Sequence, residues 1–176
     1  MKPPNLEKEL EYCRQSLMKT DYDHYLISLF MPLKKRQSLW VLGAFREVIE
    51  TIPLSVSDPA LGYMRLTWWR DQIAILERGG LTKGQPVLSA IQSHLSNYNL
   101  LSDFINEHEA IIETPEAAFN STVYPKLLQL VLGPDFARYQ TLETKLTEIL
   151  KSHHGTKWER NPPFLALRLL MANLFT

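Results

Sequence analysis

The sequence has little of what marks secreted, nucleic-acid-binding or membrane-spanning proteins. Its single cysteine, Cys13, excludes an internal disulfide and favours a reducing compartment. The 19 basic and 19 acidic residues leave no net charge, so no broad attraction to nucleic acid is expected. The polar N-terminus lacks an apolar signal core, and no run reaches the roughly 18 apolar residues that a membrane span needs. We therefore expect a cytoplasmic protein without nucleic-acid partners, with peripheral contact to the inner membrane left open.

Glycine is also scarce, at 7 residues, and alternating runs of β-branched residues are absent. Apolar residues instead recur at intervals of three and four, which is typical of amphipathic helices. The predicted fold class is therefore all-α, a single helical bundle over residues 1–176 without repeat or linker. We expect helices over about 5–19, 20–31, 33–52, within 55–80, and over 86–96, 100–113, 115–132, 134–153 and 162–175.

Local start and stop signals support several of these boundaries. Asp21 or Asp23 lies near the start of the second predicted helix, where a carboxylate can cap free amide groups. Ser57 or Asp58 can cap the fourth helix in the same way. Gly79-Gly80 is expected to end that helix.

The helix over 33–52 is apolar around much of its circumference, which predicts a central position. Glu47 and Glu50 occupy its remaining stripe, one turn apart. Two hypotheses stay open: the carboxylates face a cavity and bind Mg²⁺ or another cation, or they face water or pair with arginines. Pro53 follows at once and is expected to end the helix, because proline lacks the amide hydrogen that a helix needs.

Two further stretches carry candidate binding residues. Arg65 and Trp69 are four apart and share a helical face, where they can clamp an anion, form a cation–π pair or shield the rim of the core. Lys34, Lys35 and Arg36 fill the first turn of the helix over 33–52, where cations oppose the helix dipole. An anion at this helix N-terminus would relieve that repulsion, and a solvated basic turn is the alternative.

The stretch "MPLKKRQSLWVLGAFREVIE" resembles the first signature helix of the squalene/phytoene synthase family, which reads approximately L-P-x-x-x-R-x-x-x-W-x-x-Y-A-x-C-R-x-x-D-D-x-x-D. Without a gap, Pro32, Arg36, Trp40 and Ala44 fall on its shared positions. "SDPALGYMRLTWWRDQI" and "QPVLSAI" resemble the stretches that follow in the family, so the resemblance covers roughly 20–113. These enzymes join two prenyl diphosphates head to head inside an all-α isoprenoid-synthase fold. The resemblance implies that fold, here shortened.

The sequence departs from the family at the catalytic motif. Active members carry D-x-x-x-D on this helix, and its two carboxylates hold Mg²⁺ against a substrate diphosphate. Here the first aspartate position is Glu50, the second is Leu54, and Glu47 replaces an arginine. No second D-x-x-x-D follows, and the segment that would carry it is missing. The pattern resembles a non-catalytic branch that includes a mitochondrial respiratory complex I assembly factor and bacterial relatives.

The resemblance therefore implies a binding or assembly protein with no catalytic residue, no metal ligand and no cofactor. Its alternative is a prenyl-diphosphate transferase of isoprenoid biosynthesis, which would need Mg²⁺ and a degenerate or dimer-completed site. A scaffold without a ligand cavity is the third hypothesis. The residues expected to bind a substrate, or a prenyl or lipid-like ligand, are Arg36, Glu47, Glu50, Arg65 and Trp69.

A shortened bundle also bears on the oligomeric state. Loss of helices from a closed fold exposes apolar surface, which is usually covered by another chain. We therefore expect a homodimer or a hetero-complex, with the helix over 162–175 as a candidate contact.

Overall fold

The computed structural model describes residues 6–82, 84–113 and 120–151, and every regular element in these ranges is a helix. In chain order they are α1 (Leu6–Thr20), α2 (Tyr22–Ser28), α3 (Leu33–Ser55), α4 (Pro59–Glu77), α5 (Pro86–His94), α6 (Tyr98–Glu109), α7 (Tyr124–Leu132), the 3₁₀ turn η1 (Gly133–Asp135) and α8 (Phe136–Lys151). The all-α prediction is thus confirmed. The predicted helix over 162–175 lies outside the described residues.

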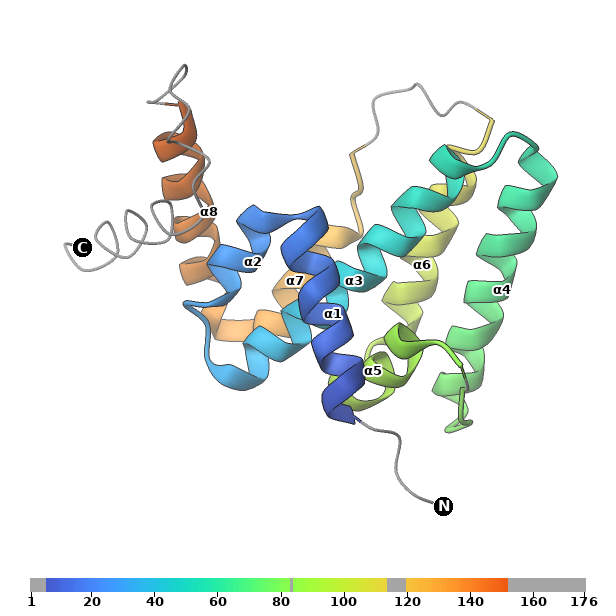
Figure 1. Ribbon diagram of the computed structural model, residues 1–176, viewed down its shortest axis with the longest axis horizontal. Coiled ribbons are helices and arrows are strands. Elements are labelled where there is room, and N and C mark those ends of the chain that lie inside the picture. The colour runs from blue at the N-terminus through green and yellow to red at the C-terminus, as the bar shows by residue number, and fades with distance from the viewer. Residues whose placement is uncertain (1–5, 83, 114–119, 152–176) are drawn as a thin grey trace.

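The central position of α3 follows from its apolar circumference. Figure 1 shows α3 running through the middle of the bundle, with α4 and α6 on one side and α2, α7 and α8 on the other. Helices α1, α2, α4, α5, α6 and α7 all contact it. Val41, Leu42, Phe45 and Ile49 of α3 have no solvent exposure. Burying these side chains stabilises the fold by roughly 1.5–3 kcal/mol each, so α3 anchors both halves of the core.

The prediction that Pro53 ends the central helix was wrong. Helix α3 continues through Pro53 and Leu54 to Ser55, and only Val56 adopts an extended conformation. Pro53 lies in the last turn, so it removes one intrahelical hydrogen bond close to an end that frays in any case, and its ring is buried. The Ser55 hydroxyl donates to the Ile52 carbonyl at 3.2 Å, which satisfies one of the terminal carbonyls. Position 54 therefore stays in helical register.

The predicted capping residues are confirmed where the structure describes them. Asp21 precedes α2 and its carboxylate accepts from the His24 amide at 3.2 Å. Asp58 caps α4 in the same way, accepting from the Ala60 amide at 2.9 Å. Gly79 follows α4 with a φ of 75°, a left-handed conformation that glycine adopts without steric cost.

Within the described part of the range predicted as a helix over 115–132, residues 120–123 are not helical and α7 begins at Tyr124. Ser121 and Thr122 precede it in a turn that the Glu107 carboxylate holds: the Ser121 hydroxyl donates to it at 2.6 Å, as does the Thr122 hydroxyl. The Ser121 oxygen in turn accepts from the Tyr124 amide at 2.9 Å, which starts the helix. The Ser121 side chain binds a backbone amide that would otherwise be free to join a helix turn further upstream. The apolar periodicity of the sequence does not reveal this interaction.

Candidate functional site

Arg36 stabilises the end of a neighbouring helix. Its Nη2 donates to the Leu29 carbonyl at 2.6 Å and to the Met31 carbonyl at 3.3 Å, just after α2. A cation at the carbonyl end of a helix satisfies unpaired acceptors and complements the helix dipole. This guanidinium is therefore engaged with backbone of its own chain.

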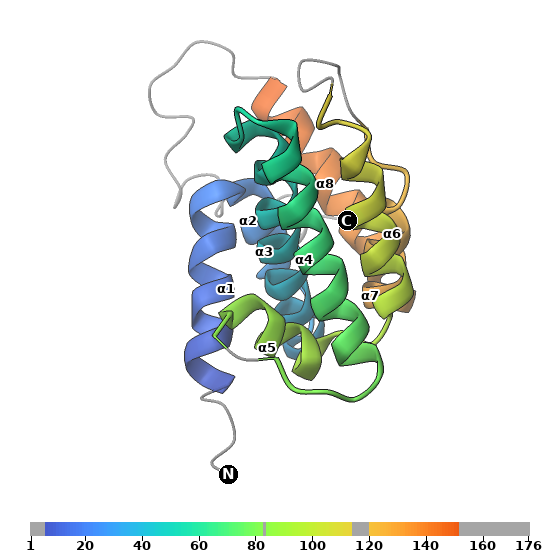
Figure 2. The same ribbon diagram turned by 90° about the vertical axis from the view of Figure 1, so that its right-hand side faces the viewer.

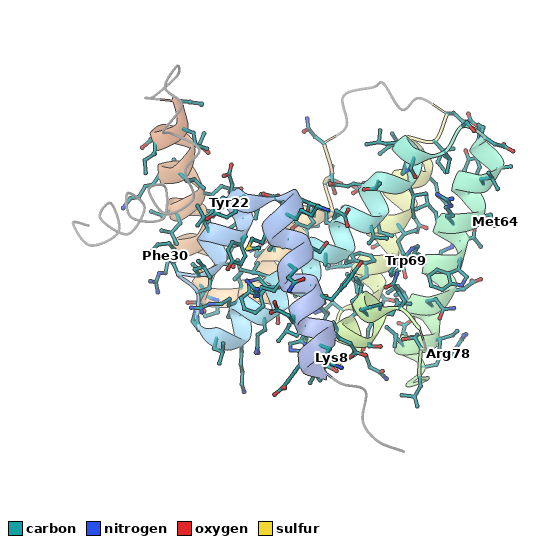
Figure 3. The ribbon with its side chains drawn as sticks, viewed as in Figure 1. Lys8, Tyr22, Phe30, Met64, Trp69 and Arg78 are labelled. Carbon is teal, nitrogen blue, oxygen red and sulfur yellow. The ribbon has the colours of Figure 1, made fainter. Side chains whose placement is uncertain are left out.

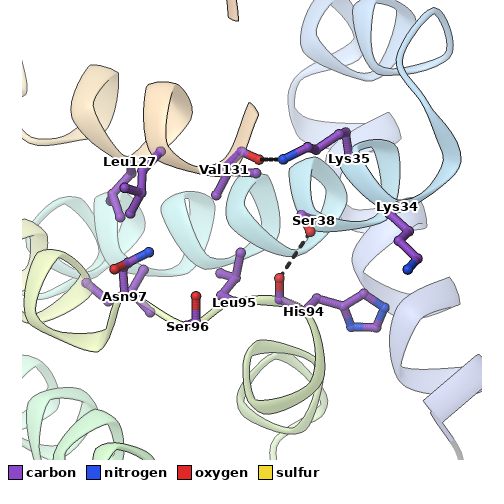
Figure 4. A pocket seen from close by; sticks show the side chains of 11 residues that line it. Lys34, Lys35, Ser38, His94, Leu95, Ser96, Asn97, Leu127 and Val131 are labelled. Atoms are coloured by element: carbon purple, nitrogen blue, oxygen red, sulfur yellow. Dashed lines mark hydrogen bonds between the residues drawn. The ribbon is translucent and has the colours of Figure 1, made fainter. Parts of the chain in front are cut away.

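Lys35, in the same basic turn, binds the end of α7. Its Nζ donates to the Val131 carbonyl at 2.6 Å, an interaction that Figure 4 shows at the edge of a hollow of about 300 Å³. Lys34 lines the same hollow together with His94 and Asn97. Two of the three cations of this turn thus hold helix ends in place, which offsets their unfavourable position at the start of α3.

Glu50 forms an ion pair with an arginine that lies one turn earlier on α3. The Glu50 Oε2 is 3.5 Å from Nε of Arg46, and the Glu50 side chain is 44% exposed. Arg46 also donates to the Asp21 carboxylate, and its guanidinium carbon lies 4.7 Å from the centre of the Tyr124 ring. The carboxylate at the family's first aspartate position is thus neutralised by a cation from its own helix.

His24 completes this polar cluster. Its Nδ1 lies 2.7 Å from Oδ2 of Asp21, and its Nε2 lies 3.5 Å from Oε1 of Glu143 on α8. Burial alone would lower the pKa of His24, but the two carboxylates outweigh it and raise the pKa to about 9. For Asp21, burial acts to raise the pKa, and His24 and Arg46 hold it well below its usual range. The cluster is a set of paired charges that joins α2, α3, α7 and α8.

Glu47 and Leu54 occupy the other positions of the family motif. Glu47 is partly buried, and its carbonyl accepts the Thr51 hydroxyl at 2.6 Å. Leu54 is 70% exposed and offers no donor atom. Within the described ranges, no group of three or more His, Cys, Asp or Glu side chains is arranged to hold a metal ion. With one carboxylate neutralised and the other absent, the residues at these positions do not fit a Mg²⁺–diphosphate site.

Trp69 and Arg65 lie at the opposite side of α3. Trp69 is 4% exposed and meets Phe45 edge-on, with ring centres 6.0 Å apart. Together with Val48, Ile52, Met64 and Trp68, these two residues line an apolar groove of about 450 Å³ between α3 and α4. Arg65 supplies the charge at this groove, and its Nη1 is 3.5 Å from the Ser55 hydroxyl.

The five predicted binding residues therefore do not share one site. Arg65 and Trp69 line the groove, whereas Arg36 and Glu50 are engaged elsewhere with groups of the same chain. Arg36 and Glu50 are separated by about 21 Å along α3, at 1.5 Å per residue.

Arg46, the centre of the polar cluster, was missed by sequence reasoning. Its spacing of four from Glu50 is a signal for an intrahelical ion pair that sequence reasoning could have used. The contribution of Asp21 and His24 carries no such local signal, because they lie on another helix.

Comparison with protein families gives a match to the squalene/phytoene synthase model over residues 17–113, more than half of the chain. The chain belongs to this family. Its similar curated relatives include the protein named NADH dehydrogenase (ubiquinone) complex I, assembly factor 6, from Bos taurus, 29% identical over 68% of this chain, and from Homo sapiens, 27% identical over 68%. The Drosophila melanogaster homolog of that factor is 26% identical over 63% of the chain. No solved structure matches.

The match covers only part of each relative. This family member spans about a third of the length of the curated relatives, 34% for the bovine and human proteins. The matched region of the family model contains all five predicted binding residues as well as Asp21, His24 and Arg46. None of the helices in the described part of the chain is long and apolar enough to cross a bilayer.

Proposed function

We propose that this chain is a non-catalytic member of the squalene/phytoene synthase family that binds a protein partner during the assembly of a larger complex. The observation that carries the proposal is the state of the first aspartate motif. Glu50 is paired with Arg46, and Leu54 has no carboxylate, although α3 holds position 54 in register. Prenyl transfer in this family depends on carboxylate-bound Mg²⁺ to stabilise the leaving diphosphate, and these side chains cannot supply that clamp.

The printed names of the relatives support an assembly role. The bovine and human proteins are named as assembly factors of NADH dehydrogenase complex I, and each aligns with 119 residues of this chain. We propose the same class of role here, in the cytoplasm or at the inner membrane surface, within a hetero-complex. Of the predicted binding residues we assign Arg65 and Trp69 to partner binding, and Arg36 and Glu50 to holding the fold.

A substrate-consumption assay tests the absence of catalysis. The purified full chain is incubated with farnesyl or geranylgeranyl diphosphate and Mg²⁺, with an active squalene synthase as the positive control, and pyrophosphate release is followed. We expect no release and no Mg²⁺-dependent heat with a diphosphate analogue in calorimetry. Turnover that Glu50→Gln abolishes would instead establish the transferase alternative.

A genetic experiment tests the assembly role. Deletion of the gene in its own organism is expected to lower the amount of assembled NADH dehydrogenase on native gels while its subunits are still synthesised. The wild-type gene should restore assembly, and the Glu50→Gln gene should do so equally because this carboxylate has no catalytic role. Unchanged levels of the assembled enzyme after deletion would refute the assembly role.

A further inference from the structure

Helix α4 carries a second apolar face that points away from the bundle. Its inner face buries Leu66, Trp69 and Ile73 in the core. On the outer side stand Leu61, Met64, Trp68 and Ile75, which we call the outer stripe; Leu61 is 43%, Met64 61% and Trp68 44% exposed, whereas Ile75 is half-buried. A helix that is apolar on opposite faces normally packs between two layers. Here only one layer is in place among the described residues.

The figures agree with this placement. In Figure 3 Met64 projects from the outer side of α4, while Trp69 lies on the side that faces α3. In Figure 2 α4 lies nearest the viewer, and no other described helix covers its outer side. Among the described residues, nothing therefore covers the outer stripe.

The spacing of the outer stripe is that of a helix–helix seam. Leu61, Trp68 and Ile75 repeat every seven residues, Met64 adds the intermediate position three residues after Leu61, and Asp71 holds the equivalent position after Trp68. Heptad-spaced apolar residues present a straight seam into which a second helix packs its own side chains. From residue 61 to residue 75 the seam is about 21 Å long, or about four helical turns. This length suits a helix better than a small ligand.

The seam continues into the groove between α3 and α4. Val48 and Ile52 line the groove from α3, and Trp68 and Trp69 line it from α4, with their ring centres 5.4 Å apart. Tryptophan, methionine and arginine are the residue types enriched at protein–protein interfaces, and tryptophan and arginine dominate their binding energy. The groove gives an approaching helix a pocket for one bulky apolar side chain.

Arg65 defines the charge that the partner needs. Within the described chain it forms no ion pair, and its closest polar contact is the Ser55 hydroxyl at 3.5 Å. Arg65 flanks the seam, and the positions of a parallel second copy of α4 that would face it, Ala60 and Thr67, carry no carboxylate. A different helix with an acidic residue beside its apolar seam fits both the shape and the charge.

We propose that the outer stripe and the adjoining groove dock an amphipathic helix of a partner protein, with apolar residues at heptad spacing and a carboxylate opposite Arg65. The proposal rests on the proposed function and names the surface and the class of partner. It is the helix-in-groove mode of recognition, in which shape and apolar burial give affinity and one charge fixes orientation.

Two designed peptides test the proposal on the full chain. Each has about 21 residues, three heptads, with isoleucine and leucine at the seam positions; one carries glutamates beside the seam and the other carries lysines. Each is labelled, and its anisotropy is measured as the protein is added. We expect the glutamate peptide to bind with a Kd below about 100 µM and the lysine peptide to bind at least about tenfold more weakly.

Variants then assign the binding to this surface. Trp68→Ser and Met64→Asp are expected to weaken binding of the glutamate peptide at least about tenfold, whereas Leu33→Glu, an equally exposed leucine at the far end of α3, should leave it unchanged. Arg65→Glu should reverse the preference in favour of the lysine peptide. Circular dichroism of each variant confirms that α4 is folded.

The contrary outcomes are equally specific. Absence of binding to either peptide, or binding that Met64→Asp and Arg65→Glu leave unchanged, overturns the proposal. Sedimentation that shows a wild-type dimer and a Met64→Asp monomer would assign the surface to a second copy and also overturn it. None of these results bears on prenyl diphosphate consumption, so the proposed lack of catalysis fails or stands separately.

Discussion

The two sides of α3 differ in whether the charged side chains there have partners among the described residues. On one side Arg46 pairs with Glu50 and Asp21 and lies over the Tyr124 ring, so charges are paired within the chain. On the nearly opposite side Val48 and Ile52 border a groove whose charge, Arg65, has no partner in the described ranges. A carboxylate or guanidinium that is removed from water needs an opposite charge or hydrogen bonds within the fold, whereas an apolar surface can remain exposed at moderate cost in free energy.

This difference separates two roles within one helix. The paired side fixes how α2, α7 and α8 pack, so changes there should alter stability. The exposed side chains of the open side, Arg65 and Trp68 among them, contribute little to the isolated fold, so changes at these residues should alter binding. Each prediction below tests one half of this comparison, beginning with the largest effect.

Replacement of Arg46 tests the paired side most strongly. Arg46→Met removes the cation between two carboxylates, and Asp21, whose side chain is only 19% exposed, is then left without its arginine. We expect a loss of about 3 kcal/mol in the free energy of unfolding, measured by urea denaturation. The matched Arg65→Met on the open side should change it by no more than about 0.5 kcal/mol. Equal losses in both variants would remove the distinction.

The pH dependence of stability reports on the same cluster. The folded protein holds the His24 proton more tightly than the unfolded chain does, since its pKa rises from 6.5 to about 9. The stabilisation by protonated His24 is therefore complete below pH 6.5 and is lost as the pH rises through 9. We expect a decrease of about 1–3 kcal/mol across this range. His24→Gln should flatten the profile; an unchanged slope would exclude His24 as its source.

Glu50→Gln separates structural from catalytic use of this carboxylate. The side chain is 44% exposed and its ion pair with Arg46 is partly screened, so the loss in unfolding free energy should be below about 1 kcal/mol. We also expect no change in Mg²⁺ binding, measured by calorimetry. A large Mg²⁺-dependent heat in the wild type that this variant lacks would instead show a metal site on the paired side.

Trp68→Ser is expected to have the smallest effect on the fold. Trp68 is 44% exposed on the outer stripe of α4, so its removal should change the unfolding free energy by about 0.5 kcal/mol or less. Thermal unfolding followed by circular dichroism measures this. A loss comparable with that of Arg46→Met would mean that Trp68 belongs to the core, and the open side would no longer be a free binding surface.

Much of the fold could be predicted because helices are encoded locally. Apolar spacing identified the helices, and Asp21, Asp58 and Gly79 marked boundaries that the structure confirms. Two boundaries were wrong for a common reason. Pro53 is buried inside α3, and the Ser121 hydroxyl donates to the Glu107 carboxylate. The local apolar periodicity of the sequence reveals neither interaction. A proline near a helix end costs little, and a serine turn held by a distant carboxylate delays a helix start.

The sequence by itself determined the helical architecture, the central place of α3 and the loss of the family's aspartate pair, since Glu50 and Leu54 are properties of residue type and spacing. Only the tertiary structure decided what Arg46 and Arg65 face on other helices. Spacing assigns side chains to stripes and indicates a pair within one helix, such as Arg46 and Glu50, but it does not identify partners on other helices. The fold brings Asp21 to Arg46 and, among the described residues, leaves Arg65 without a carboxylate. That pairing depends on how α2 and α4 pack against α3, and local sequence does not contain it.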